Sequence, residues 1–201
     1  MASKKQTDQD SMQVANNKVL HLVDKCKKND PLAQRALYNH FSGKMFALCR
    51  RYLTAQDAED MLVEAFVKVF KKIHQFENKG SFEGWLRRVM VNQCLAYIQK
   101  TKAKYLEVDI EEATYSIGKN DDTVASMQAE DLLKLVEELP VGYRTVFNLY
   151  AIEGYSHKEI AEKLMISEGT SKSQLSRARV LLQQKVKSLD QDEQKHIQHP
   201  S

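Results

Sequence analysis

Residues 57–70 read DAEDMLVEAFVKVF, and the spacing of the apolar side chains in this stretch predicts an amphipathic helix. Successive apolar residues are three or four positions apart, which is the repeat of one face of an α-helix. Thr54 precedes the stretch and can cap its first turn, with Asp57 three residues further on. The apolar stripe consists of Ala58, Met61, Leu62, Ala65, Phe66, Val69, Phe70 and Ile73. We therefore expect a helix over about 54–73 that buries one face.

Four residues of the same stretch lie off the buried stripe and form a second row. Asp60, Val63, Glu64 and Val67 are spaced i, i+3, i+4 and i+7, so they share one side of the helix. A surface row that mixes carboxylates with valines is a candidate for binding another molecule. The alternative is valines without a partner, because single exposed apolar residues are common on folded proteins.

The segment that follows predicts a loop and a second long helix. The loop is polar and runs from His74 to Gly80, and Ser81 then opens a helix that reads SFEGWLRRVMVNQCLAYIQK. Phe76 in the loop could either pack in the core or stack on a ligand, whereas Trp85 is expected to pack inward. The basic and amide side chains expected on the outer side of this helix and at its end include Arg88, Asn92, Lys100 and Lys102.

Upstream of residue 54 the sequence predicts two further helices. Residues 1–17 are polar, and we expect them to be disordered. A short helix should run over about 18–28. Asp30 and Pro31 then mark the start of the second of these helices, because aspartate is a good N-cap and proline at the first helical position loses no hydrogen bond.

The last third of the chain predicts a helix-turn-helix. A helix resumes near Thr123 and stops at Pro140, and a short one over about 142–152 ends at Gly154. Ser156 and Glu159 form a capping box for the next helix, and Ser167 can cap the one after it. Two short helices separated by a tight turn, with basic and amide groups facing outward on the second, are typical of this DNA-binding motif. The tail over 189–201 is polar and is expected to fray.

Charge is distributed unevenly along the 201 residues. Residues 18–104 contain 17 Lys and Arg against 8 Asp and Glu, residues 105–131 contain 1 against 8, and residues 132–188 contain 9 against 6. Two basic blocks separated by an acidic segment suggest two modules joined by a linker. Basic surfaces attract phosphate, but solvated lysine-rich helix faces are common, and charge alone favours that alternative. The predicted organisation is a terminus over 1–17, a domain over 18–104, a linker over 105–122, a domain over 123–188 and a tail over 189–201.

Composition excludes several classes of protein. Only three prolines and seven glycines occur, which favours a helical chain over a turn-rich β-sandwich. No apolar run approaches the roughly 20 residues that span a bilayer, and the polar start MASKKQTDQDSMQ is unlike a secretory signal. Three widely spaced cysteines, Cys26, Cys49 and Cys94, fit ordinary packing residues in a reducing cytoplasm rather than a disulfide framework or a metal site. The sequence carries no catalytic triad, metalloprotease or phosphate-loop motif, so we expect no enzymatic activity, no small-molecule substrate and no cofactor.

Two stretches of the chain resemble a known family. Residues 30–102, above all DAEDMLVEAFVKVF (57–70) and GSFEGWLRRVMVNQ (80–93), are similar to the second conserved region of RNA polymerase sigma factors of the extracytoplasmic-function (ECF) type. Residues 130–187, above all LPVGYRTVFNLYAIEGYSHKEIAEKLMISEGTSKSQLSRAR (139–179), are similar to the fourth region. Together they cover about two thirds of the chain. The resemblance implies an all-α fold of two small domains joined by an acidic flexible linker, the second containing the helix-turn-helix.

The resemblance also implies partners and site residues. The first domain is expected to bind core RNA polymerase and the melted −10 element of promoter DNA, and the second to read the −35 element as duplex. An anti-sigma factor remains open as a further partner, and no insertion into a membrane is expected. Candidates for core-polymerase binding are Asp60, Val63, Glu64 and Val67. Candidates for the −10 strand are Phe76, Arg88, Asn92, Lys100 and Lys102. Candidates for the −35 element are Lys172 and Arg179 for phosphates, with Ser173, Gln174 and Arg177 for base edges.

The chain departs from the family pattern at four positions. Val63 stands where the family usually has glutamine, which replaces an amide hydrogen bond with an apolar contact. Gln174 and Ser176 stand where arginine and histidine are frequent, which changes the expected −35 sequence. Met165 stands at a glycine position in the turn, at a cost of about 1 kcal/mol. Two other functions remain to be separated from a sigma factor: a helix-turn-helix regulator that is not a polymerase subunit, and an adaptor that binds only other proteins.

Overall fold

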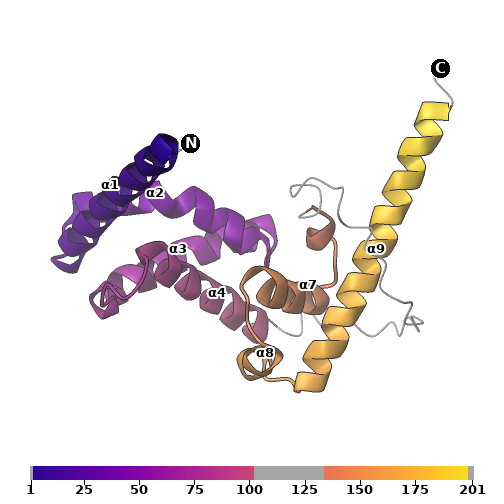
Figure 1. Ribbon diagram of the computed structural model, residues 1–201. Coiled ribbons are helices and arrows are strands. Elements are labelled where there is room, and N and C mark those ends of the chain that lie inside the picture. The colour runs from indigo at the N-terminus through magenta and orange to yellow at the C-terminus, as the bar shows by residue number, and fades with distance from the viewer. Residues whose placement is uncertain (1, 102–133, 199–201) are drawn as a thin grey trace. The chain divides into compact units, whose positions relative to one another are not determined.

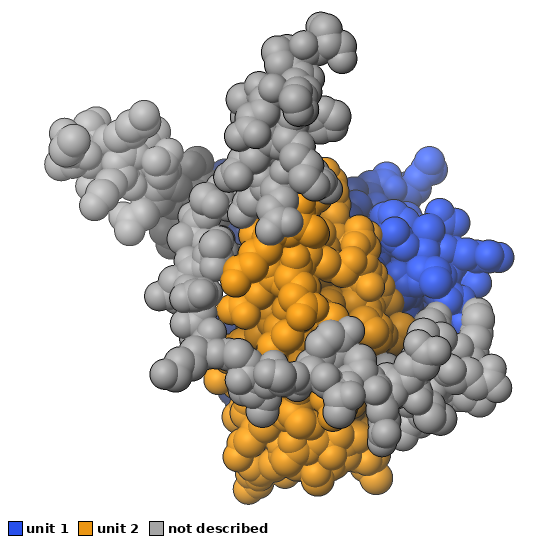
Figure 2. Space-filling view, turned by 90° about the vertical axis from the view of Figure 1, so that its right-hand side faces the viewer, with its two compact units in different colours: residues 1–97 blue, residues 98–201 orange. Residues whose placement is uncertain are grey.

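The protein is all-helical in the part that the structure describes. The computed structural model describes residues 2–101 and 134–198, with only the backbone given for residues 2–13, 15 and 190–198, and those ranges contain helices, turns and no strand. The chain divides into two compact units, residues 1–97 and 98–201 (Figures 1 and 2). The predicted all-α fold class is confirmed. The division falls near the end of the helix that opens at Ser81, a few residues before the predicted end of the first domain at Lys104.

Unit 1 is built from four α-helices and one short 3-10 helix. They are α1 (Ala2–Lys27), α2 (Pro31–Arg50), α3 (Ala55–Lys72), η1 (Ile73–Gln75) and α4 (Phe82–Lys100). The predicted caps are in place, because Asp30 Oδ1 accepts from the N–H groups of Leu32 and Ala33 at 2.9 and 3.2 Å, and Thr54 Oγ1 accepts from the N–H of Asp57 at 3.3 Å. These contacts satisfy amides that have no partner inside the helix. The caps therefore set where α2 and α3 begin.

The N-terminal segment differs from the prediction. Helix α1 begins at Ala2, whereas the sequence analysis assigned 1–17 to a disordered terminus and started the first helix at about residue 18. Residues 1–30 contain neither glycine nor proline, and Lys, Gln, Ala and Met are strong helix formers. Low hydrophobicity pointed to disorder, but intrinsic propensity with no helix breaker favours one continuous helix.

The core of unit 1 lies between α2, α3 and α4. Leu37, Phe41 and Met45 on α2 are at most 2% exposed, and Leu86 and Met90 on α4 are fully buried. The predicted apolar stripe of α3 is also buried up to Ile73, apart from Phe70, which is half-buried. The three cysteines, Cys26, Cys49 and Cys94, are buried in the same unit, as expected for small packing residues.

Unit 2 contains the predicted helix-turn-helix. From Val141 onward, its described elements are α7 (Val141–Phe147), η3 (Asn148–Ile152), α8 (His157–Leu164) and α9 (Glu168–Gln198). The helix predicted over 142–152 is present, but its last five residues wind as a π-helix, and Gly154 then turns the chain with a φ of 77°. The capping box between Ser156 and Glu159 starts α8. Met165 ends α8 in the left-handed conformation with φ 56° and ψ 45°. This is the turn position at which a glycine was expected and methionine stands instead.

Helix α9 runs further than predicted. It continues to Gln198, past the point where the tail over 189–201 was expected to fray. Pro200 is the first helix breaker after Gly169, and the helix formers Leu, Gln, Lys and Glu fill half of the interval. Helix α9 packs on the segment just before α7 through a cluster of Leu135, Val136, Leu139, Ala178, Leu182 and Val186, and Tyr143 and Phe147 of α7 pack against this cluster.

Two predicted features lie outside the described residues. These are the acidic linker over 105–122 and the helix start near Thr123. Among the helices described in residues 2–101 and 134–198, none combines the length and the apolar character needed to cross a membrane.

Candidate polymerase-docking and DNA-binding surfaces

One helix of unit 1 presents a row of acidic and apolar side chains to solvent. Asp60, Val63, Glu64 and Val67 on α3, which we call the docking row, are all exposed. Val63 is 56% and Val67 47% exposed, although both are β-branched apolar residues. The opposite side of α3 is buried, with Ala58, Ala65 and Val69 inaccessible. The helix is therefore fixed by its inner face, and its outer face has apolar area left for a partner.

Polar side chains of α4 form hydrogen bonds with side chains of α3. Gln93 is 8% exposed, and its amide group donates to Glu64 Oε2 at 2.9 Å and accepts a hydrogen bond from Lys68 Nζ. One turn further along α4, the hydroxyl of Tyr97 donates to Asp57 Oδ1. The hydrogen bond to Asp57 raises the pKa of Tyr97 to about 12, so this phenol stays protonated. The sequence analysis did not find Gln93 or Tyr97. The sequence did contain a signal for Gln93, because its spacing from Leu86 and Met90 places this polar residue on the buried face of the helix.

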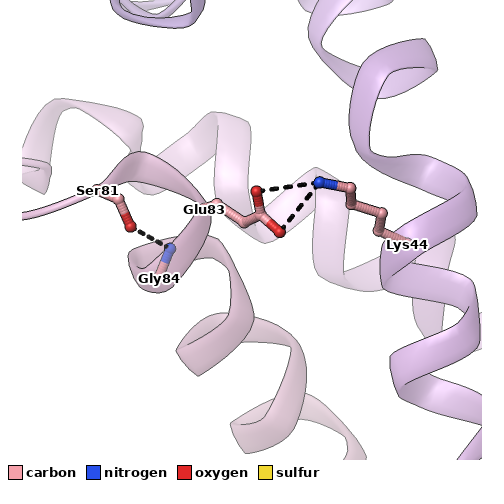
Figure 3. A network of polar contacts seen from close by, with 4 residues as sticks. All are labelled: Lys44, Ser81, Glu83 and Gly84. Atoms are coloured by element: carbon pink, nitrogen blue, oxygen red, sulfur yellow. Dashed lines mark hydrogen bonds and ion pairs between the residues drawn. The ribbon is translucent and has the colours of Figure 1, made fainter. Parts of the chain in front are cut away.

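An ion pair joins the first turn of α4 to α2, as Figure 3 shows. Ser81 Oγ accepts from the N–H of Gly84 at 3.0 Å, and Lys44 Nζ on α2 lies 3.3 and 3.4 Å from the two carboxylate oxygens of Glu83. Both partners of the ion pair are well exposed, so its contribution to stability is small. Helix α4 carries the −10 candidates. Of these, Arg88, Asn92 and Lys100 are exposed on α4, and Lys102 lies outside the described residues.

Phe76 does not occupy the place that base stacking requires. Its side chain is 2% exposed and packs against Phe82 and Trp85, with ring centroids 5.3 and 5.9 Å apart. Lys27 of α1 donates a hydrogen bond to the Phe76 carbonyl at 2.9 Å. Phe76 is therefore a core residue that anchors the loop, and its assignment to the −10 strand is corrected, because an aromatic ring with no exposed face cannot stack on a base. The apolar contacts available in unit 1 decide between the two alternatives left open for this residue.

The recognition helix presents most of its predicted side chains to solvent. Ser167 Oγ accepts from the N–H of Thr170 at 2.9 Å and so caps α9 as predicted. Lys172 and Ser173 are exposed, and Gln174 is half-buried. Arg177 is exposed and reaches the Tyr143 hydroxyl of α7 at 3.4 Å, a contact weak enough to be exchanged for a ligand.

Arg179 belongs to a small cluster at the start of α8. Its guanidinium lies 5.8 Å from the centre of the Tyr150 ring, which stacks on His157 with centroids 4.7 Å apart. His157 Nδ1 is 2.9 Å from the hydroxyl oxygen of the fully buried Ser171. His157 is thereby held in one orientation at the first residue of α8. The cluster places His157 on the same part of unit 2 as Arg179.

Comparison with known families matches both units. The profile of the Sigma-70 region 2 family matches residues 37–104, and the profile of the Sigma-70 region 4 family matches residues 129–182. The first range contains the docking row and α4, and the second contains the helix-turn-helix. A two-unit helical protein with these two regions in this order is of the sigma-70 class.

Individual relatives define the group more closely. The chain is 30% identical over 179 residues to the ECF RNA polymerase sigma-E factor of Escherichia coli (strain K12), covering 84% of this chain and 94% of that protein. It is 28% identical over 179 residues to the protein of the same name from Haemophilus influenzae, covering 84% and 95%. Among solved structures it is similar to the sigma factor RpoE of Bartonella quintana in complex with the anti-sigma factor NepR, with 22% identity, a TM-score of 0.46, and coverage of 76% of this chain and 96% of that chain. The chain belongs to the ECF family of RNA polymerase sigma factors.

Proposed function

We propose that this sigma factor binds core RNA polymerase through the docking row of α3. Asp60 and Glu64 offer negative charge, and Val63 and Val67 offer apolar area between and beside the two carboxylates. Apolar area at the centre of a contact supplies affinity, and charges around it select and orient the partner. The observation that carries this proposal is that both valines are about half exposed on a helix whose inner face is fully packed.

Promoter DNA is read by both units in this proposal. Helix α9 enters the major groove of the −35 element, where Arg177, Ser173 and Gln174 can match base edges while Lys172 and Arg179 bind phosphates. Arg88, Asn92 and Lys100 on α4, with Lys102, contact the melted −10 strand, because bases outside the stack expose edges that amide and guanidinium groups can bind. With Phe76 in the core, the stacking surface must come from other residues.

Polymerase performs the chemistry, so the chain contributes no catalytic residue and no cofactor in this proposal. The protein works in the cytoplasm, where polymerase and promoter meet. A helix-turn-helix regulator without a polymerase partner would account for α8 and α9 alone. It would leave the docking row without a role, although the region 2 profile spans residues 37–104.

Charge reversal at the docking row tests the proposal. Asp60→Lys combined with Glu64→Lys should abolish binding to purified core polymerase, measured by anisotropy of the labelled protein without DNA. Asp24→Lys combined with Glu162→Lys is the matched control, because it changes the net charge equally at exposed positions on α1 and α8. Circular dichroism should show both variants folded. Equal core affinity of the two double variants would refute docking through this row.

A further inference from the structure

Gln93 is a buried polar side chain whose partners all come from another helix. It is 8% exposed on α4, and its contacts reach Met61, Glu64 and Lys68 on α3. A buried amide must find hydrogen-bond partners, because leaving its groups unpaired is unfavourable. An apolar residue at this position would avoid that demand. The amide therefore does something that packing alone does not require.

The Gln93 amide lies between two groups of opposite charge, the carboxylate of Glu64 and the ammonium group of Lys68. Its nitrogen donates to Glu64 Oε2 at 2.9 Å and lies 3.8 Å from Met61 Sδ, and its oxygen accepts from Lys68 Nζ. Glu64 and Lys68 are four residues apart on α3, the spacing at which a glutamate and a lysine form an ion pair on a helix surface. The amide takes the place of that direct pair. Lys68 Nζ therefore bonds to the Gln93 oxygen, and Glu64 Oε2 accepts from the Gln93 nitrogen.

We propose that Gln93 is a positioning residue for the polymerase-docking row. The inference rests on the proposed function, because Gln93 can affect polymerase binding only if Glu64 contacts the polymerase as part of the docking row. Gln93 holds the Glu64 carboxylate in one orientation before the partner arrives and holds the Lys68 ammonium group away from it. Ordering one long side chain in advance should improve affinity by about threefold to tenfold.

The composition of the docking row explains why an amide from α4 matters at this surface. Val63 and Val67 leave the docking row itself without an amide side chain. Gln93 supplies an amide to Glu64 from α4 instead, at a position where it is sheltered from water. The amide lies under the row rather than in it, so its effect must pass through Glu64.

A thermodynamic cycle on the full chain separates positioning from general stability. Gln93→Leu keeps a similar volume in an apolar setting and removes the amide contacts to Met61, Glu64 and Lys68. Gln93→Met is used instead if the leucine variant does not fold. The dissociation constant for core polymerase is measured in three backgrounds: wild type, Asp60→Ala and Glu64→Ala. Gln93→Leu should raise the constant by about threefold to tenfold in the wild-type and Asp60→Ala backgrounds and leave it unchanged in the Glu64→Ala background. A merely structural role would give the same factor in all three.

The same cycle distinguishes the two ways of being wrong. If Asp60→Ala and Glu64→Ala each weaken core binding but Gln93→Leu has no effect, or an equal effect in every background, the inference is overturned and the docking proposal stands. If Asp60→Ala and Glu64→Ala both leave core affinity unchanged, the docking proposal is overturned and the inference with it.

Discussion

Removing the apolar part of the docking row should weaken core binding by an amount that follows from its exposure. Val63→Ala and Val67→Ala each delete two methyl groups, and a fully buried methyl group contributes about 0.8 kcal/mol. Val63 has 56% and Val67 has 47% of its surface left to bury, so the expected losses are about 0.9 and about 0.75 kcal/mol. At about 1.4 kcal/mol for each factor of ten, Val63→Ala should raise the dissociation constant about fivefold and the double variant about fifteenfold.

Leu32→Ala provides the control for this measurement. Leu32 is 77% exposed on α2, away from the docking row, so its truncation removes exposed apolar area without touching the proposed interface. The assay is anisotropy of each labelled protein titrated with core polymerase, alongside thermal unfolding of the free protein, which surface truncations should leave nearly unchanged. Equal core affinity of Leu32→Ala and the valine double variant would refute the argument that the exposed valines are buried by polymerase.

Three further predictions concern other parts of the molecule. Ser156→Ala removes the cap of α8 and should destabilise unit 2 by about 1 kcal/mol in denaturant unfolding. The Ser156 contacts lower the pKa of Glu159 below its ordinary 4.5. The part of the cap that depends on the Glu159 carboxylate is therefore complete above that pH and is lost as pH falls through the lower folded-state pKa, and this pH dependence of the unfolding free energy should be absent in Glu159→Gln. Burial raises the pKa of Cys26 to about 11. All three cysteines are buried, so at pH 8 a thiol reagent should label them only as fast as the protein opens, and rapid labelling of the native protein would contradict their burial. Arg177→Ala should weaken binding of holoenzyme to its −35 element by about 1–3 kcal/mol and relax preference at one base pair, whereas a uniform loss on all sequences would indicate a phosphate contact.

Local signals in the sequence were sufficient for the starts of α2, α3, α8 and α9. The period of the apolar residues in 57–70 predicted the buried face of α3, because a helix can bury only residues that share a face. Asp30, Thr54, Ser156 and Ser167 were recognisable as caps because their effect acts within three residues of sequence. The second row of α3 was visible by the same reasoning, since whatever lies off the buried stripe is exposed.

Contacts between helices could not be derived in this way. The burial of Phe76 depends on Phe82 and Trp85, and the role of Gln93 depends on α3, about 30 positions earlier in the chain. Periodicity shows which face of a helix is buried but not which residue it meets. The N-terminal helix was missed for a different reason: its polar composition was read as disorder, although nothing in residues 2–27 interrupts a helix.

The central claim is that this chain directs core polymerase to promoters, and transcription itself tests it most directly. Purified core polymerase is incubated with fragmented genomic DNA of the source organism, with and without the purified chain, and the 5′ ends of the transcripts are sequenced. The account predicts a set of discrete start sites that appears only when the chain is present, shares a −10 and a −35 element, and disappears with Asp60→Lys and Glu64→Lys. Identical transcript ends with and without the chain would contradict it.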